Sequence, residues 1–595
     1  MIGRSSILPA AYAFLLIALA AGEPVRTVGD GNEYLSYALT LSHGNAPPLN
    51  GAAIAEVRAD IAPFDHSFLD WRLVESGHRA ADGRLDFVHF WLYPALAAPL
   101  VGVARVTGAD PRIGFTILNI ALLVTAFVVV NARAGWTVAL LIMAGPILWW
   151  SNKIHPEAYI VSLAAIIVAV WRERPWLAVI CAGLLAAQVP PFGVLLPMIV
   201  VSTAIARRDV LRVRAFWIAC AAGVLLAALP TFYYLARFGT PSLFSRAATP
   251  HWPTWGEISA IPWDLNIGLF PNWPLFGIAV AVSLVSLVVR RRSALLEPGI
   301  VMSLFGALAV LFSAPQIGNY LHGATPGIIR YAVWLTPFAV PLLAIARGTG
   351  VRHLLTATAV VSSILCVIQY RPSVGEFAHR PTKIALWVWS HAPAWSNPLP
   401  ELFAKSLDPS RTTLPVATPD CGKVLMVGRG DTQGMWPRPC APAAISEECR
   451  RPAALCYANA SNGSHSFQPV TVPLEFKYDP GSVWPRRAEE AVARLLAEVD
   501  LPALRRVMPE EFDTVIPAAQ GVRVESVFTS EGRTLMILLP AEPGARVELR
   551  QRPRRLVLLD GATGETLIAA PDERSGRYWL PLPSGASVVV IAVFL

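Results

Sequence analysis

Apolar runs of membrane-spanning length dominate this chain and constrain its fold more than any other feature. They recur through residues 1–370 and are separated by short polar segments. The chain of 595 residues is 54% hydrophobic and 15% charged, and its mean hydropathy is +0.49. This composition is too apolar for an ordinary water-soluble globular protein. The sequence therefore predicts a polytopic α-helical membrane protein.

The lengths of the runs predict about eleven transmembrane helices. The first run, 7–22, also fits a cleavable signal peptide, but we favour a retained anchor because the chain that follows is itself apolar. In either case the residues after it are delivered outside. The other expected spans are 113–131, 134–150, 158–171, 175–188, 193–206, 215–236, 271–289, 299–313, 329–346 and 354–369.

The segment 87–107 decides the topology, because it is apolar enough to span but contains Pro94 and Pro99. If it stays outside or only dips into the membrane, every Arg cluster between spans becomes cytoplasmic, as the positive-inside rule requires. The clusters are Arg172/Arg174, Arg207/Arg208/Arg212/Arg214, Arg290/Arg291/Arg292 and Arg347/Arg352. The Arg residues that contribute to the net charge of +8 lie in short clusters between spans, as topology signals do. Nucleic acid is therefore not an expected partner.

This assignment predicts a transmembrane domain at 1–370 with an external first loop at 23–112. The N-terminus is then cytoplasmic and the domain 371–595 lies on the outer side of the cell membrane.

The domain 371–595 is predicted to be mixed and mainly β. A helix is expected at 486–507, and strands are expected at 522–528, 534–539, 556–559 and 588–595, which suggest a β-sandwich-like end. Closely spaced cysteines in an oxidising compartment predict two disulfides near its start. A zinc site is the alternative, although no C-x-x-C pair is present. The cysteines are Cys421, Cys440, Cys449 and Cys456.

Two acids directly follow the first apolar run. Asp30 and Glu33 are spaced i, i+3, so they share one face if a helix begins at Gly31. The structural alternative is that Asp30 is an N-cap and Glu33 completes a capping box. An N-cap position also fixes a carboxylate in one orientation, so a catalytic role for Asp30 stays open.

A polar loop at 151–157 carries Lys153, His155 and Glu157. Glu157 follows Pro156, which is an ordinary way to begin a helix, because the helix dipole favours an acid there. Two cationic side chains beside a carboxylate at a membrane surface also suit an anionic ligand.

Two later segments carry further candidates. In the segment 319–331, His322, Arg330 and Tyr331 precede a span, where Arg330 either snorkels to lipid phosphate or holds the phosphate of a lipid-linked substrate. In the loop 237–270, Trp263 and Asp264 belong to a Trp-rich stretch that suits either an interfacial aromatic belt or the stacking of sugar rings.

In the order of these motifs and in their predicted position on one side of the membrane, the chain resembles the bacterial GT-C glycosyltransferases. These integral membrane enzymes use polyprenyl-phosphate-linked sugars, and they include aminoarabinose transferases and protein mannosyltransferases. The resemblance covers roughly residues 1–370. It rests on the elements Asp30-Gly31-Asn32-Glu33-Tyr34, His89-Phe90-Trp91-Leu92-Tyr93-Pro94, His155-Pro156-Glu157 and Arg330-Tyr331.

The resemblance implies that Asp30 takes the proton of an acceptor hydroxyl as it attacks the anomeric carbon, with inversion. Glu33 and Glu157 are the other catalytic candidates. Cationic groups would stabilise the departing phosphate. The substrate-binding candidates are His89, Tyr93, Lys153, His155, His322, Arg330, Tyr331, Trp263 and Asp264.

The expected partners are a polyprenyl-phosphate-linked sugar donor, membrane lipids, and a glycan, lipid or protein acceptor. No metal ligands are assigned, and a divalent cation stays open as a cofactor. Two other functions also stay open. A transporter or flippase usually carries ionisable residues within its spans, which are nearly free of them here. In a non-catalytic scaffold, the C-terminal domain would bind a partner.

Overall fold

The computed structural model divides the chain into two compact units, Met1–Ala53 with His78–Leu474 and Ile54–Gly77 with Glu475–Leu595. The structure describes residues 4–21, 23, 25–64, 77–244, 252–290, 295–316, 324–325, 327–346, 349–374, 382–391, 416–417, 423–427, 444–445, 455–459, 466–469, 505–506, 519–520, 522–530, 533–540, 545–549, 553–560, 572–574, 577–582 and 589–594.

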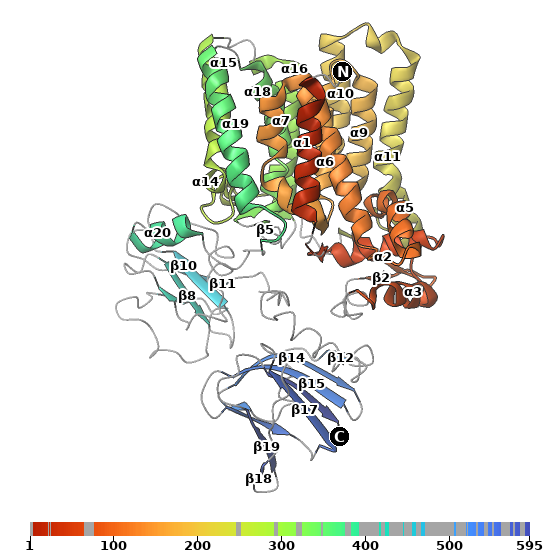
Figure 1. Cartoon of the computed structure of the whole chain (residues 1–595), viewed down its shortest axis with the longest axis vertical. Helices are drawn as coiled ribbons and strands as arrows, with labels where there is room; N and C mark the ends of the chain where they lie inside the picture. The colour runs from red at the N-terminus through yellow and green to blue at the C-terminus, as the bar shows by residue number, and fades with distance from the viewer. Residues whose placement is uncertain are drawn as a thin grey trace. The chain divides into compact units, whose positions relative to one another are not determined.

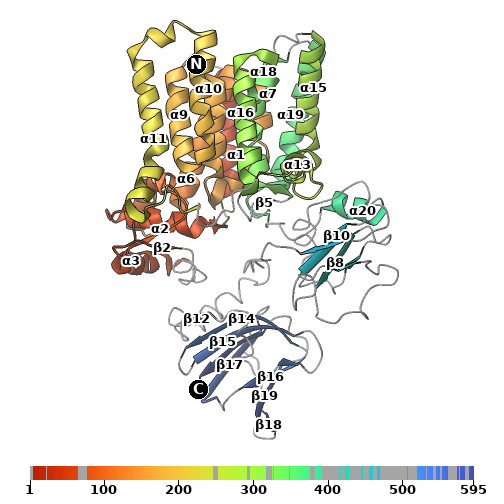
Figure 2. The ribbon, with the colours of Figure 1, turned by 180° about the vertical axis from the view of Figure 1, so that it is seen from behind.

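The first unit contains a bundle of apolar helices that lie side by side (Figure 1, Figure 2). Within the described residues, four helices are long and apolar enough to cross a membrane, namely Ile113–Ala134, Arg214–Phe238, Pro298–Gln316 and Gly350–Gln369. Shorter apolar helices occupy Ile7–Ala20, Leu92–Val106, Glu157–Val170, Pro175–Gln188, Pro190–Ala206, Pro274–Val289 and Arg330–Ile345. These helices indicate a multi-pass membrane protein, and the number of crossings stays a prediction.

The α-helices are, in chain order, α1 (Arg4–Ala20), α2 (Gly31–Ser42), α3 (Gly51–Ile61), α5 (Leu92–Val106), α6 (Ile113–Ala134), α7 (Trp136–Met143), α8 (Glu157–Val170), α9 (Pro175–Gln188), α10 (Leu195–Ala206), α11 (Arg214–Phe238), α13 (Trp255–Trp263), α14 (Leu269–Asn272), α15 (Pro274–Arg290), α16 (Pro298–Ser313), α17 (Arg330–Val333), α18 (Val340–Ile345), α19 (Thr349–Gln369) and α20 (Lys383–His391). The 3-10 helices are η1 (Pro146–Asn152), η2 (Pro190–Val194), η3 (Val210–Arg212), η5 (Ala314–Gln316) and η6 (Thr336–Ala339).

The segment 87–107 forms α5, which doubles back along the first turns of α6. The Tyr93 hydroxyl donates to Asn119 Oδ1 at 2.8 Å, and a Cβ on Gly114 would lie 2.5 Å from the backbone nitrogen of Val101. Helix α5 therefore packs against the first half of α6 at one end of the bundle, and whether the segment 87–107 crosses a membrane stays a prediction. Figure 1 shows α5 at that end, beside α2.

Two of the basic clusters meet at the other ends of their helices. Arg172 follows α8 and Arg207 follows α10, and the Arg207 guanidinium donates to the Arg172 carbonyl at 3.3 Å. The alternation of the helices thus separates these Arg residues from the loops that carry the candidate site. Which side of a membrane each end faces stays a prediction.

Two expected spans are not single α-helices. The span 329–346 consists of α17, η6 and α18. The span 134–150 forms α7, breaks at Gly145 and Pro146, and continues as η1. A Cβ on Gly145 would lie 2.3 Å from the indole ring of Trp273, so a side chain from a distant part of the chain packs directly against the break.

The first unit also contains a sheet of the order β7-β8-β10-β11-β9. Its strands are Val416–Ala417, Lys423–Val427, Leu455–Asn459, Ser466–Pro469 and Ala444–Ile445 in that order. Cys456 lies in β10, whereas Cys421, Cys440 and Cys449 lie outside the described residues. No disulfide occurs among the side chains that the structure describes, where Cys181, Cys220 and Cys366 are free. The predicted pairing of the four clustered cysteines stays a prediction.

The second unit ends in two antiparallel sheets that share one apolar core. One sheet has the order β12-β14-β15-β20-β17, with β12 (Arg505–Arg506), β14 (Val522–Ser530), β15 (Arg533–Pro540), β20 (Val589–Phe594) and β17 (Arg555–Asp560). The other has the order β13-β16-β19-β18, with β13 (Ala519–Gln520), β16 (Arg546–Leu549), β19 (Arg577–Pro581) and β18 (Asp572–Arg574).

The sequence patterns of this unit are confirmed for the strands and not for the helix. All four expected strands are present, as β14, β15, β17 and β20. Val527 of β14 and Val547 of β16 are fully buried in the shared core, because alternate residues of each strand face the other sheet. Of the expected helix 486–507, only Arg505–Arg506 is described, and these residues form strand β12.

Small residues let α9 and α11 approach closely. A Cβ on Gly183 would lie 2.5 Å from the carbonyl oxygen of Gly223, and backbone atoms cannot move aside as a side chain can. Close approach of helices at small residues is a common way of packing in membranes.

We predict that Gly183→Ala forces α9 and α11 apart and destabilises the protein by about 1–3 kcal/mol. The measurement is the thermal unfolding temperature of the purified protein in detergent. Gly193→Ala is the matched control, because its new Cβ would lie 3.9 Å from Ala186, an ordinary contact. Equal unfolding temperatures for the two variants would contradict the close packing.

Candidate functional site

A short parallel strand pair brings the first loop to the 151–157 loop. Strand β1 (Arg26–Thr27) pairs with β4 (Lys153–Ile154), so that Thr27 lies opposite Ile154. The chain then turns through Gly29, whose φ of 53° lies in the left-handed region that favours glycine. A Cβ on Gly31 would lie 2.6 Å from the carbonyl oxygen of Ile154. The start of α2 is therefore pressed directly against β4.

Asp30 occupies the N-cap position of α2, but its side chain makes no capping hydrogen bond. The capping interpretation of this carboxylate is therefore wrong. Its Oδ2 atom instead lies 3.3 Å from Arg330 Nη1, 3.6 Å from His89 Nε2 and 3.8 Å from His155 Nε2. These partners come from three segments that are remote in sequence. The side chain remains 30% exposed, so a ligand can reach it.

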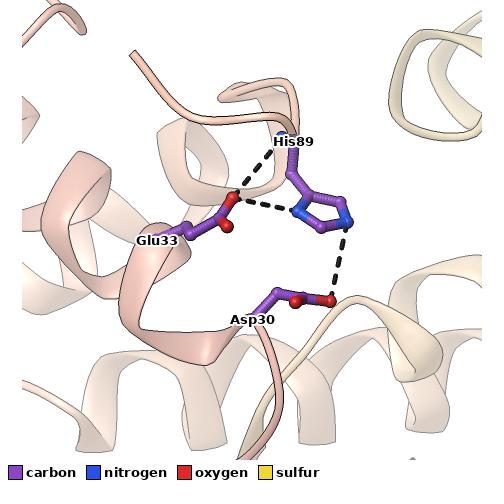
Figure 3. Close-up of side chains that lie close together, drawn as sticks. All are labelled: Asp30, Glu33 and His89. Carbon is purple, nitrogen blue, oxygen red and sulfur yellow. Dashed lines mark hydrogen bonds and ion pairs between the residues drawn. The ribbon is translucent and has the colours of Figure 1, made fainter. Parts of the chain in front are cut away.

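Glu33 also does not complete a capping box. Its Oε2 atom lies 2.9 Å from Nδ1 of His89 and 3.5 Å from the backbone nitrogen of the same residue (Figure 3). The Glu33 side chain is 8% exposed, compared with 17% for His89. His89 thus lies between the two acids of the first loop, with one ring nitrogen toward each (Figure 3).

The third acid, Glu157, is fully buried at the first position of α8. Its Oε2 atom is hydrogen-bonded to Nδ1 of His155. The other ring nitrogen of His155, Nε2, lies 3.0 Å from Nη1 of Arg330. The Arg330 Nη2 group donates to the Tyr331 hydroxyl at 3.0 Å. Glu157, His155, Arg330 and Asp30 are therefore linked in one polar cluster.

The ring of Tyr34 packs against this cluster. Its centroid lies 5.3 Å from that of His89, 5.8 Å from that of His155 and 5.7 Å from that of Tyr93. Tyr34 is buried, so it fixes the two imidazole rings from the side of α2. We refer to Asp30, Glu33, His89, His155, Glu157, Arg330 and Tyr331 as the polar cluster.

Burial and charge shift the pKa values of the members of the polar cluster that belong to the first loop. Burial acts to raise the pKa of Asp30, but the positive charges of His89 and Arg330 hold that pKa well below its usual value. Burial dominates at Glu33 and raises its pKa. Burial acts to lower the pKa of His89, but the charges of Asp30 and Glu33 outweigh it and raise that pKa.

Two sequence candidates hold the scaffold of the site. The Lys153 ammonium donates to Asn152 Oδ1 at 2.6 Å and to the Pro372 carbonyl at 2.8 Å, which ties the chain after α19 to β4. The Tyr93 hydroxyl donates to Asn119. These contacts suit positioning roles for both side chains and do not support phosphate binding by Lys153.

The remaining candidates lie apart from the polar cluster or outside the described chain. Asp264 accepts hydrogen bonds from the backbone nitrogens of Asn266 and Ile267 at 2.8 and 3.0 Å, so it shapes a local turn. Burial raises its pKa to about 6. Trp263 is 62% exposed and packs on Phe270. His322 lies outside the described residues.

Sequence reasoning missed the residues that hold the loops. Asn119 of α6 donates to the carbonyls of Trp150 and Lys153 at 3.3 and 2.9 Å, and Gln188 accepts from the backbone nitrogen of Tyr93 at 3.0 Å. The available signal for Asn119 was an amide in the middle of an apolar run, since polar groups within spans usually have partners.

A second missed group surrounds the buried carboxylate of Asp86, in the hairpin of β2 (His78–Arg79) and β3 (Leu85–Asp86). Asp86 accepts hydrogen bonds from Tyr37 of α2 and from Tyr233 and Arg237 of α11. Tyr37 also accepts from the backbone nitrogen of Phe87 at 2.8 Å. This network anchors the chain just before His89.

A donor set for a metal is present within the described chain. Asp30, Glu33 and His89 each offer a ligand atom, and these atoms lie within 4.8 Å of one another (Figure 3). Carboxylates with imidazole suit Zn²⁺ or Mn²⁺. The Arg330 charge beside Asp30 opposes a cation there, and His89 already bridges the two acids. The sequence had assigned no metal ligands, so this set was also missed.

Comparisons with known proteins give no family for this chain. No protein-family model, no curated protein and no solved structure matches it.

We predict that Gly31→Ala separates α2 from β4 and destabilises the protein by about 1–3 kcal/mol, because the added Cβ meets the Ile154 carbonyl. Thermal unfolding in detergent checks this. Gly51→Ala, at the start of α3, is the control, since nothing lies within 4 Å of its new Cβ. An unfolding temperature for Gly31→Ala at or above that of Gly51→Ala would refute the contact.

The raised pKa of His89 predicts a pH-dependent contribution to stability. The folded protein binds this proton more tightly than the unfolded chain, so the contribution is complete below the unfolded value of about 6.5 and is lost as the pH rises through the folded value. The loss of unfolding temperature in His89→Gln should therefore shrink between about pH 6 and pH 9. His353→Gln in α19 is the control. A loss that grows with pH would contradict the raised pKa.

Proposed function

We propose that the protein is an integral membrane glycosyltransferase of the GT-C type, which moves a sugar from a polyprenyl-phosphate donor to a lipid, glycan or protein hydroxyl. The reaction would take place on the outer face of a bacterial inner membrane. One observation carries the proposal. An ionised carboxylate, Asp30, lies 3.3 Å from the guanidinium of Arg330, in a partly exposed cluster at one end of an apolar helical bundle.

Arg330 is suited to hold the departing phosphate. Its Nη groups contact Asp30, His155 and Tyr331, while its Nε–H is buried and has no hydrogen-bond partner among the described atoms. An unsatisfied buried donor costs about 1–3 kcal/mol. A phosphate oxygen would relieve this cost, since a guanidinium binds phosphate through two adjacent donors.

Asp30 is suited to hold the acceptor. Its strongly lowered pKa keeps the carboxylate ionised at neutral pH, so it can accept the hydrogen bond of an acceptor hydroxyl and orient that oxygen. In a single displacement, the hydroxyl loses its proton to a basic side chain of the polar cluster and its oxygen bonds to the anomeric carbon, while the bond from that carbon to the phosphate oxygen breaks. The electron pair stays on the phosphate, beside Arg330, and the anomeric configuration inverts.

The placement of the charges favours an enzyme over a transporter. The members of the polar cluster lie in loops or in the first turns of α2, α8 and α17, whereas transporters commonly bind their substrates near the middle of discontinuous spans. No observation in the described chain favours the scaffold alternative. The acceptor, the sugar and a divalent cation are parts of the proposal that need direct measurement.

We predict that Asp30→Asn lowers glycan transfer by about 100-fold or more while the protein still accumulates in the membrane. The measurement is a mass-spectrometric survey of lipid-linked glycans and their acceptors in cells that lack the protein and in cells that carry the wild type or a variant. Asp209→Asn is the matched control, because Asp209 is 68% exposed and pairs only locally with Arg207.

Restoration of the wild-type glycan profile by Asp30→Asn would overturn the enzymatic proposal. Sugar-independent flux of a lipid or solute in proteoliposomes, with no change in glycans, would favour the transporter instead.

A further inference from the structure

We propose that His155 is the residue that receives the acceptor's proton, that Glu157 holds it as the Nδ1–H tautomer, and that Arg330 covers its Nε2 atom until an anionic group draws the guanidinium away. The reaction step rests on the proposed glycosyl transfer. The tautomer and its covering by Arg330 follow from the contacts alone and can be tested without any transfer.

The tautomer follows from the hydrogen-bonding groups of Arg330. A guanidinium carries only donors and stays charged in proteins. Its Nη1 group lies 3.0 Å from Nε2 of His155, so Nε2 must be the acceptor and cannot carry a proton. A neutral imidazole has its single proton on the other nitrogen. The proton of His155 is therefore on Nδ1, where it is donated to Glu157.

The alternative protonation states conflict with this geometry. If a protonated Glu157 donated to Nδ1, the ring proton would move to Nε2 and face the Arg330 donor. If the ring were an imidazolium, an N–H group would again face the guanidinium. Each state places two donors against one another in a buried position, where a donor without an acceptor is unfavourable. The neutral Nδ1–H form satisfies both neighbours.

Glu157 is a positioning residue in this arrangement. It is fully buried, and its Oε1 atom has no hydrogen-bond partner among the described atoms, so its only described side-chain bond is to His155. The N-terminus of α8 favours the ionised carboxylate. A buried carboxylate that fixes one imidazole nitrogen both orients the ring and stabilises the imidazolium that forms when the other nitrogen accepts a proton.

Asp30 needs such a partner because it is a weak proton acceptor. The surrounding positive groups hold its pKa well below the usual value. Nε2 of His155 lies 3.8 Å from Asp30 Oδ2, so a hydroxyl that binds Asp30 also lies beside Nε2. Proton transfer is efficient when the acceptor is in hydrogen-bond reach of the group that loses the proton.

In the proposed reaction step, the acceptor O–H bond breaks, its oxygen bonds to the anomeric carbon, and its proton binds Nε2 of His155 to give an imidazolium. The bond from the anomeric carbon to the phosphate oxygen breaks, and its electron pair remains on the phosphate. Arg330 must release Nε2 first, and the phosphate of the donor supplies the charge that draws it away. Donor binding would thus uncover the proton acceptor.

The test is nitrogen NMR of the full-length protein in lipid nanodiscs with ¹⁵N-labelled histidine. His155→Gln identifies the His155 signals by their loss. We expect a neutral Nδ1–H tautomer without added ligand. Arg330→Met should remove the guanidinium from Nε2 of His155. That nitrogen can then carry a proton and donate a hydrogen bond to Asp30. Arg133→Met in α6 is the control, and it should leave the signals of His155 unchanged.

Undecaprenyl phosphate and inorganic phosphate are the probes for the release of Nε2. Either probe should change the Nε2 signal of His155, and an effect of the lipid alone would assign the site to lipid-linked phosphate. A proton on Nε2 before any addition overturns the proposal, and so does an Nε2 signal that responds to neither probe.

Measurements of kcat and KM distinguish this proposal from the proposed function. Once transfer is assayed, His155→Gln should lower kcat by about 100-fold or more, and Glu157→Gln should lower kcat with little change in KM for the donor. Size-exclusion chromatography shows whether each variant is folded, and the NMR of Arg330→Met remains informative if Glu157→Gln is not. Full activity of His155→Gln, with Asp30→Asn inactive, would overturn only this inference.

Discussion

The ion pair between Asp30 and Arg330 joins residues that lie 300 positions apart, and the rest of the site depends on it. The Arg330 guanidinium hydrogen-bonds both to Asp30 of the first loop and to the His155 ring. It thus bridges two side chains that also approach each other to 3.8 Å. Such an ion pair in a partly buried position is stabilising only when further hydrogen bonds satisfy its remaining donors. Here Tyr331 and His155 supply two of them, and the Nε–H group has no partner among the described atoms.

The loops around this ion pair are held in place by contacts that do not themselves face the ligand. The β1–β4 pair and Gly31 set the distance between the first loop and His155. Asn119 of α6 holds the carbonyls before His155, and Asp86 holds the segment before His89. Lys153 extends these contacts to Pro372, directly after the last long helix. Rigid elements thus position each loop, as a site needs if its reactive groups must meet within tenths of an ångström.

Local patterns in the sequence predicted the helices and strands better than the contacts between them. Apolar runs and strand alternation depend on the residues of one segment, so α2, β14, β15 and β20 lie within a few residues of their expected positions. The capping interpretation of Asp30 used the same local logic and was wrong, because distant charges attract its carboxylate more strongly than the first turn of α2 does. Lys153 looked like a ligand for anions, yet its ammonium donates to the side chain of Asn152 and to the carbonyl of Pro372, which follows by more than 200 residues. The packing of Trp273 against Gly145 is likewise a contact that no local pattern contains. The roles of the polar cluster in binding or catalysis stay predictions.

The most direct test of this account is an experimental structure of the full-length protein by cryo-electron microscopy in lipid nanodiscs, with attention to the Arg330 side chain. The account predicts that its guanidinium contacts both Asp30 and Nε2 of His155, while Glu157 bonds the opposite nitrogen of the same ring. An Arg330 side chain that points to lipid headgroups, with Asp30 and His155 apart, would contradict the convergence on which the proposed site and function rest.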